Sequence, residues 1–327
     1  MAGVEIKKVE ADESGMRLDR WFKVYYPGLG FGYLQKLLRS GQIRVDGGRV
    51  KADTRLLIGQ VVRVPPLLVD EKESLPVTDK IIREQDDRVI LKKMLLYEDS
   101  KIFVFNKPAG LAVQGGSGLT RHFDSMLEVW RNKKGEKPRL VHRLDRETSG
   151  VLIVARSRGA AQTLTAAFRA RETKKTYWAL VRGVPKKKQD KISTWVVKDI
   201  TAQGDKMCVC EHGEPDSNHA VSYYRVLDTR GRALSWLEME PYTGRTHQLR
   251  VHAAYMDNPI IGDSKYFFSD SNWKLPRGIQ NRLHLHARRI RIPHPSGGIL
   301  DITAPLPPHM VQSFNLLAFN EMDGDKE

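Results

Sequence analysis

Cysteine, long apolar runs and acidic residues are all scarce in this 327-residue chain. Its two cysteines, Cys208 and Cys210, are too close together for an ordinary disulfide framework and too few for a four-ligand zinc site, so we expect both to be reduced. No apolar run reaches the roughly 18 residues of a membrane span, and the acid-containing N-terminus is unlike a secretory signal. The sequence therefore predicts a soluble cytoplasmic protein with no membrane partner.

The shortage of acids leaves the chain strongly basic. Lys and Arg number 54 against 39 Asp and Glu, which gives a formal net charge of +15 and a pI near 9.7. Such a field concentrates phosphate polyanions at the surface, so nucleic acid is the leading class of partner. On charge alone, a basic face that is merely solvated is the alternative.

Residues 14–66 predict a small α/β module. Apolar residues at helical spacing indicate two short helices, of which Gly41 ends the second, and an Asp-Gly turn inside "QIRVDGGRV" indicates a following hairpin. Four basic residues fall on the polar faces of these helices, where we expect them to contact phosphates: Arg17, Arg20, Lys36 and Arg39.

The rest of the chain predicts a larger unit. Residues 67–93 are acid-rich and fit a linker, and residues 94–315 form the second unit. Residues 316–327 are the tail, of which the acid-rich part 320–327 is expected to be disordered. Strand and helix patterns do not alternate regularly, so we expect an α+β fold with a mainly antiparallel mixed sheet flanked by helices. The expected strands are 102–105, 151–155, 177–182, 221–226, 234–239 and 288–292, and the expected helices are 158–171 and 247–257.

The stretch "VHRLDRETSGVLIVA", residues 141–155, places charged side chains directly before a buried strand. In an extended segment Arg143 and Asp145 point to one side while His142 and Leu144 point to the other. A tight turn at residues 148–150 then leads into the strand. A carboxylate in this position is anchored on a rigid element and still faces a cleft, although ordinary turn chemistry also places Asp at strand ends.

A second polar cluster, "YTGRTHQLRVH", holds Arg245, His247, Arg250 and His252. If Thr246 caps the helix there, Leu249, Ala253 and Met256 form its buried stripe. The histidines of this cluster, with His284, His286 and His294, raise the alternative of a zinc site. They lack a His-Glu-x-x-His pattern, so we expect no metal.

Six motifs in order make the chain resemble the RluA-type pseudouridine synthase family. The central one is "HRLDRETSGVLIVA" at 142–155, and the N-terminal module is similar to the S-four-like RNA-binding domain that often precedes this catalytic domain. The other five are "NKPAGLAV" (106–113), "KKTYWALVRG" (174–183), "GRTHQLRVH" (244–252), "PIIGDSKY" (259–266) and "LHLHARRIRIPHP" (283–295).

The resemblance assigns roles residue by residue. It makes Asp145 the catalytic aspartate, Tyr177 the aromatic that stacks on the target base, and Arg143 the side chain that replaces the flipped base in the duplex. Arg250 is preferred as the partner of Asp145, with Arg245 as the alternative. His142, Arg245 and His247 are expected to contact RNA.

The resemblance further implies an isomerase that converts uridine to pseudouridine in RNA by base flipping and needs no cofactor. The intact N-terminal module favours the RluC-like branch, which acts on large-subunit (23S) ribosomal RNA. Another ribosomal site or a transfer RNA is the close alternative, and a non-catalytic RNA-binding protein is a different class. We expect a monomer that does not bind DNA. A segment at 267–278, "FFSDSNWKLPRG", departs from the family pattern and looks like an insertion.

Overall fold

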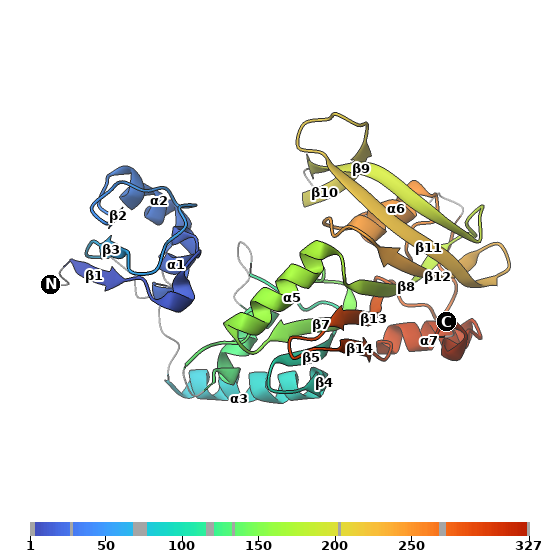
Figure 1. Cartoon of the computed structure of the whole chain (residues 1–327). Coiled ribbons are helices and arrows are strands. Elements are labelled where there is room, and N and C mark those ends of the chain that lie inside the picture. The colour runs from blue at the N-terminus through green and yellow to red at the C-terminus, as the bar shows by residue number, and fades with distance from the viewer. Residues whose placement is uncertain are drawn as a thin grey trace. The chain divides into compact units, whose positions relative to one another are not determined.

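The computed structural model describes residues 4–26, 29–67, 77–115, 121–132, 135–201, 204–267 and 273–325. The chain divides into two compact units, Met1–Arg83 and Glu84–Glu327, whose elements are labelled in Figure 1. The expected α+β class with a large mixed sheet is confirmed. Within the described residues, none of the helices is both long and apolar enough to cross a bilayer.

The first unit contains the two short helices that its apolar spacing predicts. Trp21 and Leu37, one from each helix, are buried in a common core, and Gly41 follows the second helix at a φ of +68°. The three strands pair antiparallel in the order β1-β3-β2, and β1 precedes the predicted start at residue 14. The elements are β1 (Glu5–Lys8), η1 (Ala11–Glu13), α1 (Leu18–Tyr25), α2 (Phe31–Arg39), β2 (Arg44–Val45) and β3 (Val61–Val64).

One sheet forms the framework of the second unit. Its order is β10-β9-β11-β12-β8-β13-β7-β5-β4, with β14 added to β13 and β6 to β7, and only the β13–β7 pair is parallel among the described pairs. All six predicted strand segments are present, but the hairpin of β9 and β10 was not predicted. The strands are β4 (Leu95–Glu98), β5 (Ile102–Lys107), β6 (Arg139–Leu140), β7 (Ser149–Ala155), β8 (Lys174–Arg182), β9 (Gln189–Thr201), β10 (Gly204–Cys210), β11 (Asn218–Arg230), β12 (Leu234–Pro241), β13 (Leu285–Pro293) and β14 (Ile299–Thr303).

Helices flank this sheet (Figure 1). Ser157 caps α5 by accepting a hydrogen bond from the Ala160 N–H, as its position predicted. The predicted helix at 247–257 is α6, but its N-cap is His247 rather than Thr246. The helices are α3 (Val77–Met94), α4 (Phe123–Met126), η2 (Leu127–Trp130), α5 (Arg158–Ala170), α6 (Gln248–Tyr255), α7 (Pro308–Leu316) and α8 (Glu321–Gly324).

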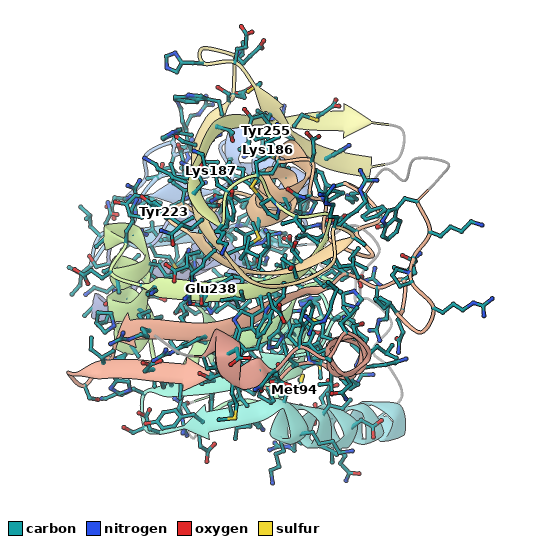
Figure 2. All side chains as sticks on the ribbon, turned by 90° about the vertical axis from the view of Figure 1, so that its right-hand side faces the viewer. Met94, Lys186, Lys187, Tyr223, Glu238 and Tyr255 are labelled. Carbon is teal, nitrogen blue, oxygen red and sulfur yellow. The ribbon has the colours of Figure 1, made fainter. Side chains whose placement is uncertain are left out.

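The expected linker at 67–93 is wrong for its second part, because α3 occupies residues from 77 onward. Asp87, Leu91 and Met94 lie at helical spacing and are all buried, and Figure 2 shows Met94 at the end of this helix. Asp87 accepts a hydrogen bond of 2.6 Å from Arg121. A charged residue therefore occupies one buried position of α3 and interrupts the apolar pattern by which the helix could have been predicted. Residues 68–76 lie outside the described part.

The expected disordered tail is also wrong. Phe319 is only 6% exposed and packs its ring 5.8 Å from that of Trp236, and α8 follows it. Arg288, distant in sequence, pairs with Asp325 at 2.5 Å. A polar, acid-rich segment is disordered when the rest of the protein offers it no contacts. Here an aromatic packing contact and an ion pair with a buried arginine hold the segment in place.

Alternation along β8 fixes the face on which the functional side chains lie. Trp178 and Leu180 enter the core cluster that contains α7 and Phe319, whereas Tyr177, Ala179 and Val181 face the cluster beneath α6. The polar pocket of the second unit therefore opens on the α6 side of the sheet.

Candidate active site

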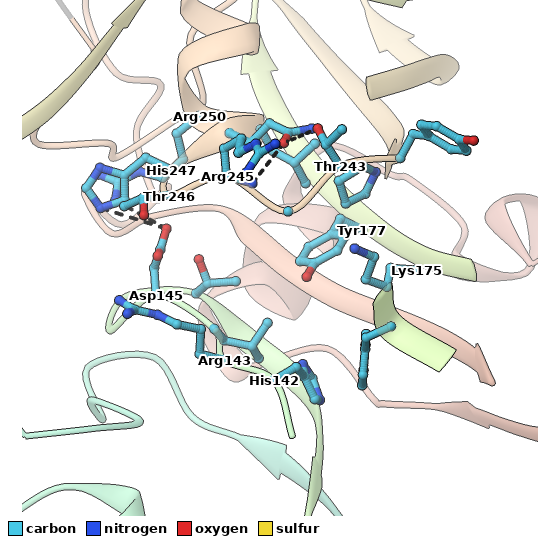
Figure 3. Close-up of a pocket in the computed structure, with 18 of the residues that line it drawn as sticks. His142, Arg143, Asp145, Lys175, Tyr177, Thr243, Arg245, Thr246, His247 and Arg250 are labelled. Carbon is cyan, nitrogen blue, oxygen red and sulfur yellow. Dashed lines mark hydrogen bonds and ion pairs between the residues drawn. The ribbon is translucent and has the colours of Figure 1, made fainter. Parts of the chain in front are cut away.

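Segments far apart in the sequence line one pocket of about 430 Å³ (Figure 3). They are the loop that leads into β7, the C-terminal end of α5, the start of β8, the segment that joins β12 to α6, and the first residue of β13. Asp145 is the only carboxylate among the described residues that line it, whereas Arg143, Arg245 and Arg250 are among its cations.

A buried lysine side chain binds the backbone of the loop that carries Asp145. Lys107 ends β5, and its ammonium donates to the carbonyl oxygens of Pro108, Leu111 and Arg146 at 2.9, 2.9 and 3.1 Å. Burial lowers the pKa of Lys107 to about 7, opposed by the charges of Glu147 and Asp145. The Gly110 N–H also bonds to the Arg146 carbonyl, so the residue next to Asp145 is fixed twice.

A close backbone approach fixes the same loop where it enters β7. Gly150 has a φ of +114°, and a Cβ atom there would lie 2.2 Å from the carbonyl oxygen of Ala287 on β13. Only glycine fits this contact. Ser149 and Gly150 belong to β7 rather than to the predicted turn, and the turn instead closes through the Thr148 N–H and the Asp145 carbonyl at 3.2 Å.

Arg250 of α6 stands between two carboxylates. Its Nε and Nη2 donate to the two oxygens of Asp263 at 2.7 and 2.6 Å, and its Nη1 lies 3.8 Å from Oδ2 of Asp145. Burial acts to lower the pKa of Arg250, but the hydrogen bond and charge of Asp263, with Asp145, leave it raised. The bidentate pair orients the guanidinium, so its free edge faces Asp145.

Asp263 is itself fully buried and locked in place. Its Oδ1 accepts the backbone N–H groups of Lys265 and Tyr266 at 2.9 and 3.1 Å. Gly262 before it has a φ of +73°, and a Cβ atom there would lie 1.9 Å from the carbonyl oxygen of Arg282. The segment can therefore make this turn only with glycine.

His247 lies beside Asp145 in a conformation that is uncommon outside glycine, with a φ of +53°. Its Nε2 is 3.9 Å from Oδ2 of Asp145, and its Nδ1 is 2.9 Å from the hydroxyl of Tyr266, which accepts the Met207 N–H at 2.8 Å. Burial lowers the pKa of His247, although Asp145 opposes the shift. A neutral ring is therefore favoured near pH 7.

Tyr177 supplies the aromatic wall of the pocket, and in Figure 3 it lies across the pocket from Asp145. Burial, with the charge of Asp145, raises the pKa of its phenol, so the hydroxyl stays protonated. An acid, a fixed cation and an aromatic ring thus surround one cavity, an arrangement that can hold a planar ring beside a carboxylate.

Other predicted site residues lie in different surroundings. His142 lines the pocket, but its Nε2 accepts the Ile153 N–H at 2.9 Å and its ring stacks 4.8 Å from Phe168; burial lowers its pKa to about 3. Arg143 is exposed at the rim. Arg245 is exposed and its Nε donates to the His219 carbonyl at 3.1 Å, so it does not reach Asp145 as Arg250 does.

In the first unit, the predicted phosphate contacts differ among themselves. Arg17 pairs with Asp19 at 2.6 Å, which neutralises part of its charge. Lys36 and Arg39 are exposed on α2.

Lys107, Asp263 and Tyr266 were missed as functional residues, although each stands inside a motif of the sequence. Two features of the sequence could have pointed to them: Asp263 follows a glycine, and Lys107 ends an apolar run. The histidines of the zinc alternative are hydrogen-bonded instead: His252 to Thr194 and Ser222, and His286 to Ser149. The described residues contain no cluster of three or more acids, histidines or cysteines suited to a metal.

The fold and the pocket together define a single-carboxylate enzyme site on a mixed sheet, and the comparisons with known proteins name its family. Residues 101–255 match the family model described as RNA pseudouridylate synthase. The chain is 35% identical over 311 residues to the ribosomal large subunit pseudouridine synthase C of Pasteurella multocida, covering 94% of this chain and 92% of that protein. It is 35% identical over 308 residues to the protein of the same name from Escherichia coli K12, covering 93% of each.

A solved structure agrees with these relatives. The human RNA pseudouridylate synthase domain containing 4 matches with a TM-score of 0.60 and 30% identity, covering 73% of this chain and 98% of that one. The chain belongs to the RNA pseudouridine synthase family, and within it to the RluA type. It is an isomerase whose substrate is RNA.

Proposed function

We propose that this protein converts specific uridines of large-subunit ribosomal RNA to pseudouridine, in the manner of the RluC-like branch. One observation carries the proposal: Asp145 is the sole carboxylate of the described pocket lining, and Arg250 holds a charged nitrogen 3.8 Å from it. Relatives that match more than nine-tenths of the chain carry a ribosomal large-subunit name, which supports the choice of RNA.

Asp145 starts the reaction in this proposal. The bond from N1 of uracil to the ribose C1′ breaks, a bond from C5 to C1′ forms, and the proton that leaves C5 is balanced by the one that N1 gains. Nothing is oxidised or reduced, so the chemistry requires no redox cofactor. The carboxylate acts either by adding to the uracil ring or by promoting departure of the base, and both routes stay open.

The neighbouring side chains hold the reactants for Asp145. Arg250 keeps a positive charge beside the Asp145 carboxylate, because a guanidinium stays protonated and its orientation is set by Asp263. Tyr177 provides the flat surface on which the extruded uracil stacks, and the exposed Arg143 fills the gap that the base leaves in the helix.

The first unit is assigned a supporting role as an S-four-like RNA-binding domain. Lys36 and Arg39 project from α2 and are placed to contact phosphates, a sequence-independent interaction that adds affinity. Arg17 contributes less because it is paired with Asp19. We further propose a cytoplasmic monomer that does not bind DNA, in keeping with an RNA substrate.

The test compares RNAs directly. Purified protein is mixed with uridine-labelled transcripts of large-subunit ribosomal RNA and of transfer RNA, and pseudouridine is measured over time. The proposal expects product in the ribosomal transcript, and pseudouridine mapping in cells with and without the protein then identifies the sites. Product in the transfer RNA transcript alone would show that transfer RNA, and not ribosomal RNA, is the substrate. Binding without product in any transcript would favour the non-catalytic RNA-binding alternative.

A further inference from the structure

The pocket extends beyond the side chains that the proposed reaction uses. We call Arg169, Arg171, Lys175 and Tyr242 the Lys175 end; all four line the pocket that also contains Asp145. Figure 3 shows Lys175 beside Tyr177, on the side of the pocket away from Asp145. Lys175 and Tyr177 are two positions apart on β8 and share a face, and two residues of a strand advance roughly 6.6 Å.

Lys175 is a partly buried cation without a counterion. It is half-buried, and burial lowers the pKa of its ammonium. Among the described residues, no carboxylate lies within ion-pairing distance of it, whereas the preceding Lys174, on the other face, pairs with Glu240 at 2.9 Å. An unpaired ammonium that is partly removed from water is stabilised by a bound anion, and the anion that RNA offers is phosphate.

Tyr242 presents a solvent-exposed aromatic ring at the Lys175 end. It is 49% exposed, and the guanidinium of Arg171 lies 4.6 Å from the ring centroid. Arg171 caps the C-terminal end of α5 with a φ of +60°, and its N–H bonds to the carbonyls of Ala167 and Phe168. The cation and the ring are therefore presented from fixed backbone. An exposed ring flanked by a cation is the arrangement that proteins use to stack unpaired bases.

We propose that the Lys175 end is a second nucleotide site, which binds the nucleotide next to the target uridine. Lys175 binds the phosphate that joins the two nucleotides, and the ring of Tyr242, backed by Arg171, stacks on the neighbouring base. This inference rests on the proposed function. Stacking accepts any base, so the site selects uridines whose neighbour is also unpaired, whatever its identity.

The first experiment follows the neighbouring base itself. A substrate hairpin carries 2-aminopurine at the position before the target, at the position after it, or four positions away. The wild-type protein, Tyr242→Ala, Tyr242→Phe and Tyr223→Ala are each bound to the three RNAs. Tyr223 is the matched control, because it is 44% exposed on β11, outside the pocket lining, and Figure 2 shows it at the surface.

The proposal expects quenched fluorescence at one of the two adjacent positions with wild type and Tyr242→Phe, and bright fluorescence there with Tyr242→Ala. Binding of the RNA should weaken roughly 5- to 150-fold in Tyr242→Ala, the range of one base stacked on an aromatic ring. Tyr223→Ala should behave as wild type in both measurements. Equal fluorescence of wild type and Tyr242→Ala at both adjacent positions would overturn the proposal.

The second experiment tests the phosphate contact. Lys175→Met keeps most of the length of the side chain and removes its charge, and Lys175→Arg restores a cation. The slope of log affinity against log salt should fall by about 1 in Lys175→Met and return in Lys175→Arg. Unchanged affinity and slope in Lys175→Met would contradict the assignment, and melting temperatures confirm that each variant is folded.

Pseudouridine is measured in the same samples, which separates the two proposals. If wild type forms no pseudouridine in any RNA, the proposed function fails. If wild type forms product and both Tyr242→Ala and Lys175→Met match Tyr223→Ala, only the second nucleotide site fails.

Discussion

The two ends of the pocket differ in how their cations are paired. At the Asp145 end, which we define as Asp145, His247 and Arg250 with Asp263 and Tyr266 behind them, Arg250 contacts both carboxylates and His247 is tied to Tyr266. At the Lys175 end, neither Lys175 nor Arg169 has an ion pair with any described residue. Paired groups fix the geometry that a reaction requires, whereas unpaired cations are available to bind the phosphates of RNA. Substitutions at the first end should affect turnover, and also stability where they break the Arg250–Asp263 pair, whereas those at the second end should affect affinity alone.

The largest effect on stability is expected from Asp263→Asn. The change keeps the shape of the side chain but removes the closer of the two counterions of the buried Arg250, which should destabilise the fold by about 3–5 kcal/mol. Turnover should fall about 10- to 100-fold, the usual effect of losing a group that orients a reacting side chain. Denaturant unfolding and single-turnover kinetics measure the two effects.

Asp301→Asn is the control for this change. Asp301 pairs with Arg289 at 2.7 Å on a partly exposed strand pair, so its loss should shift stability by only about 0–1 kcal/mol. If Asp263→Asn and Asp301→Asn are equally stable, the buried pair behind Asp145 contributes no more to stability than a partly exposed one.

Arg250→Lys should produce the next largest effect. Lysine cannot bond to both oxygens of Asp263 and still direct a charge at Asp145, so we expect turnover to fall about tenfold or more with little loss of RNA binding. Arg245→Lys, whose parent side chain reaches the His219 carbonyl instead, should affect binding more than turnover. The opposite pattern would make Arg245 the partner of Asp145.

Acid should weaken the fold through its buried, hydrogen-bonded histidines. Burial lowers the pKa of His252 and His284 to about 4 and of His286 to about 3, below the ordinary value of about 6.5. The contribution of these neutral histidines to the stability of the fold is complete above pH 6.5. It is lost as the pH falls toward 4, because the unfolded chain then binds protons that the folded chain does not bind.

The slope should reach about 1.4 kcal/mol per pH unit for each histidine that stays neutral. Melting temperatures between pH 7.5 and 4.5 measure it. A flat profile over that interval would show that these histidines are not buried as neutral groups.

Arg169→Ala should have the smallest effect. Arg169 is exposed at the Lys175 end, so its removal should leave the melting temperature unchanged and lower the salt slope of RNA binding by about 1. The exposed Arg232, outside the pocket lining, is the control and should change neither quantity. A lower melting temperature in Arg169→Ala would contradict a role confined to RNA binding.

The local pattern was sufficient for six strands of the second unit and for the place of Asp145 before one of them. A short run of charge before a buried strand identifies the strand and the acid at its mouth, and Leu249 and Ala253 lie in the buried stripe that the spacing predicts. The helix α3 was hidden because Asp87, paired with a distant arginine, occupies one position of its buried stripe.

The supports of the site could not be predicted in the same way. Asp263 and Tyr266 reach Arg250 and His247 across a tight glycine turn, and the docked tail depends on Phe319 meeting Trp236. Such contacts join residues far apart in the sequence, and no local pattern encodes them. Lys174 and Lys175 are adjacent in the sequence, and only their places on opposite faces of β8 distinguish the ion-paired Lys174 from Lys175.

The most direct measurement of the central claim compares wild type with Asp145→Asn under single-turnover conditions, with enzyme in excess over a uridine-labelled ribosomal transcript. The substitution keeps the size of the side chain, removes the negative charge and replaces one acceptor oxygen with a donor NH2 group. We predict equal affinity for the RNA and equal melting temperature, with pseudouridine formed by wild type alone. Pseudouridine appearing at the wild-type rate in Asp145→Asn would contradict the claim that this carboxylate carries the reaction.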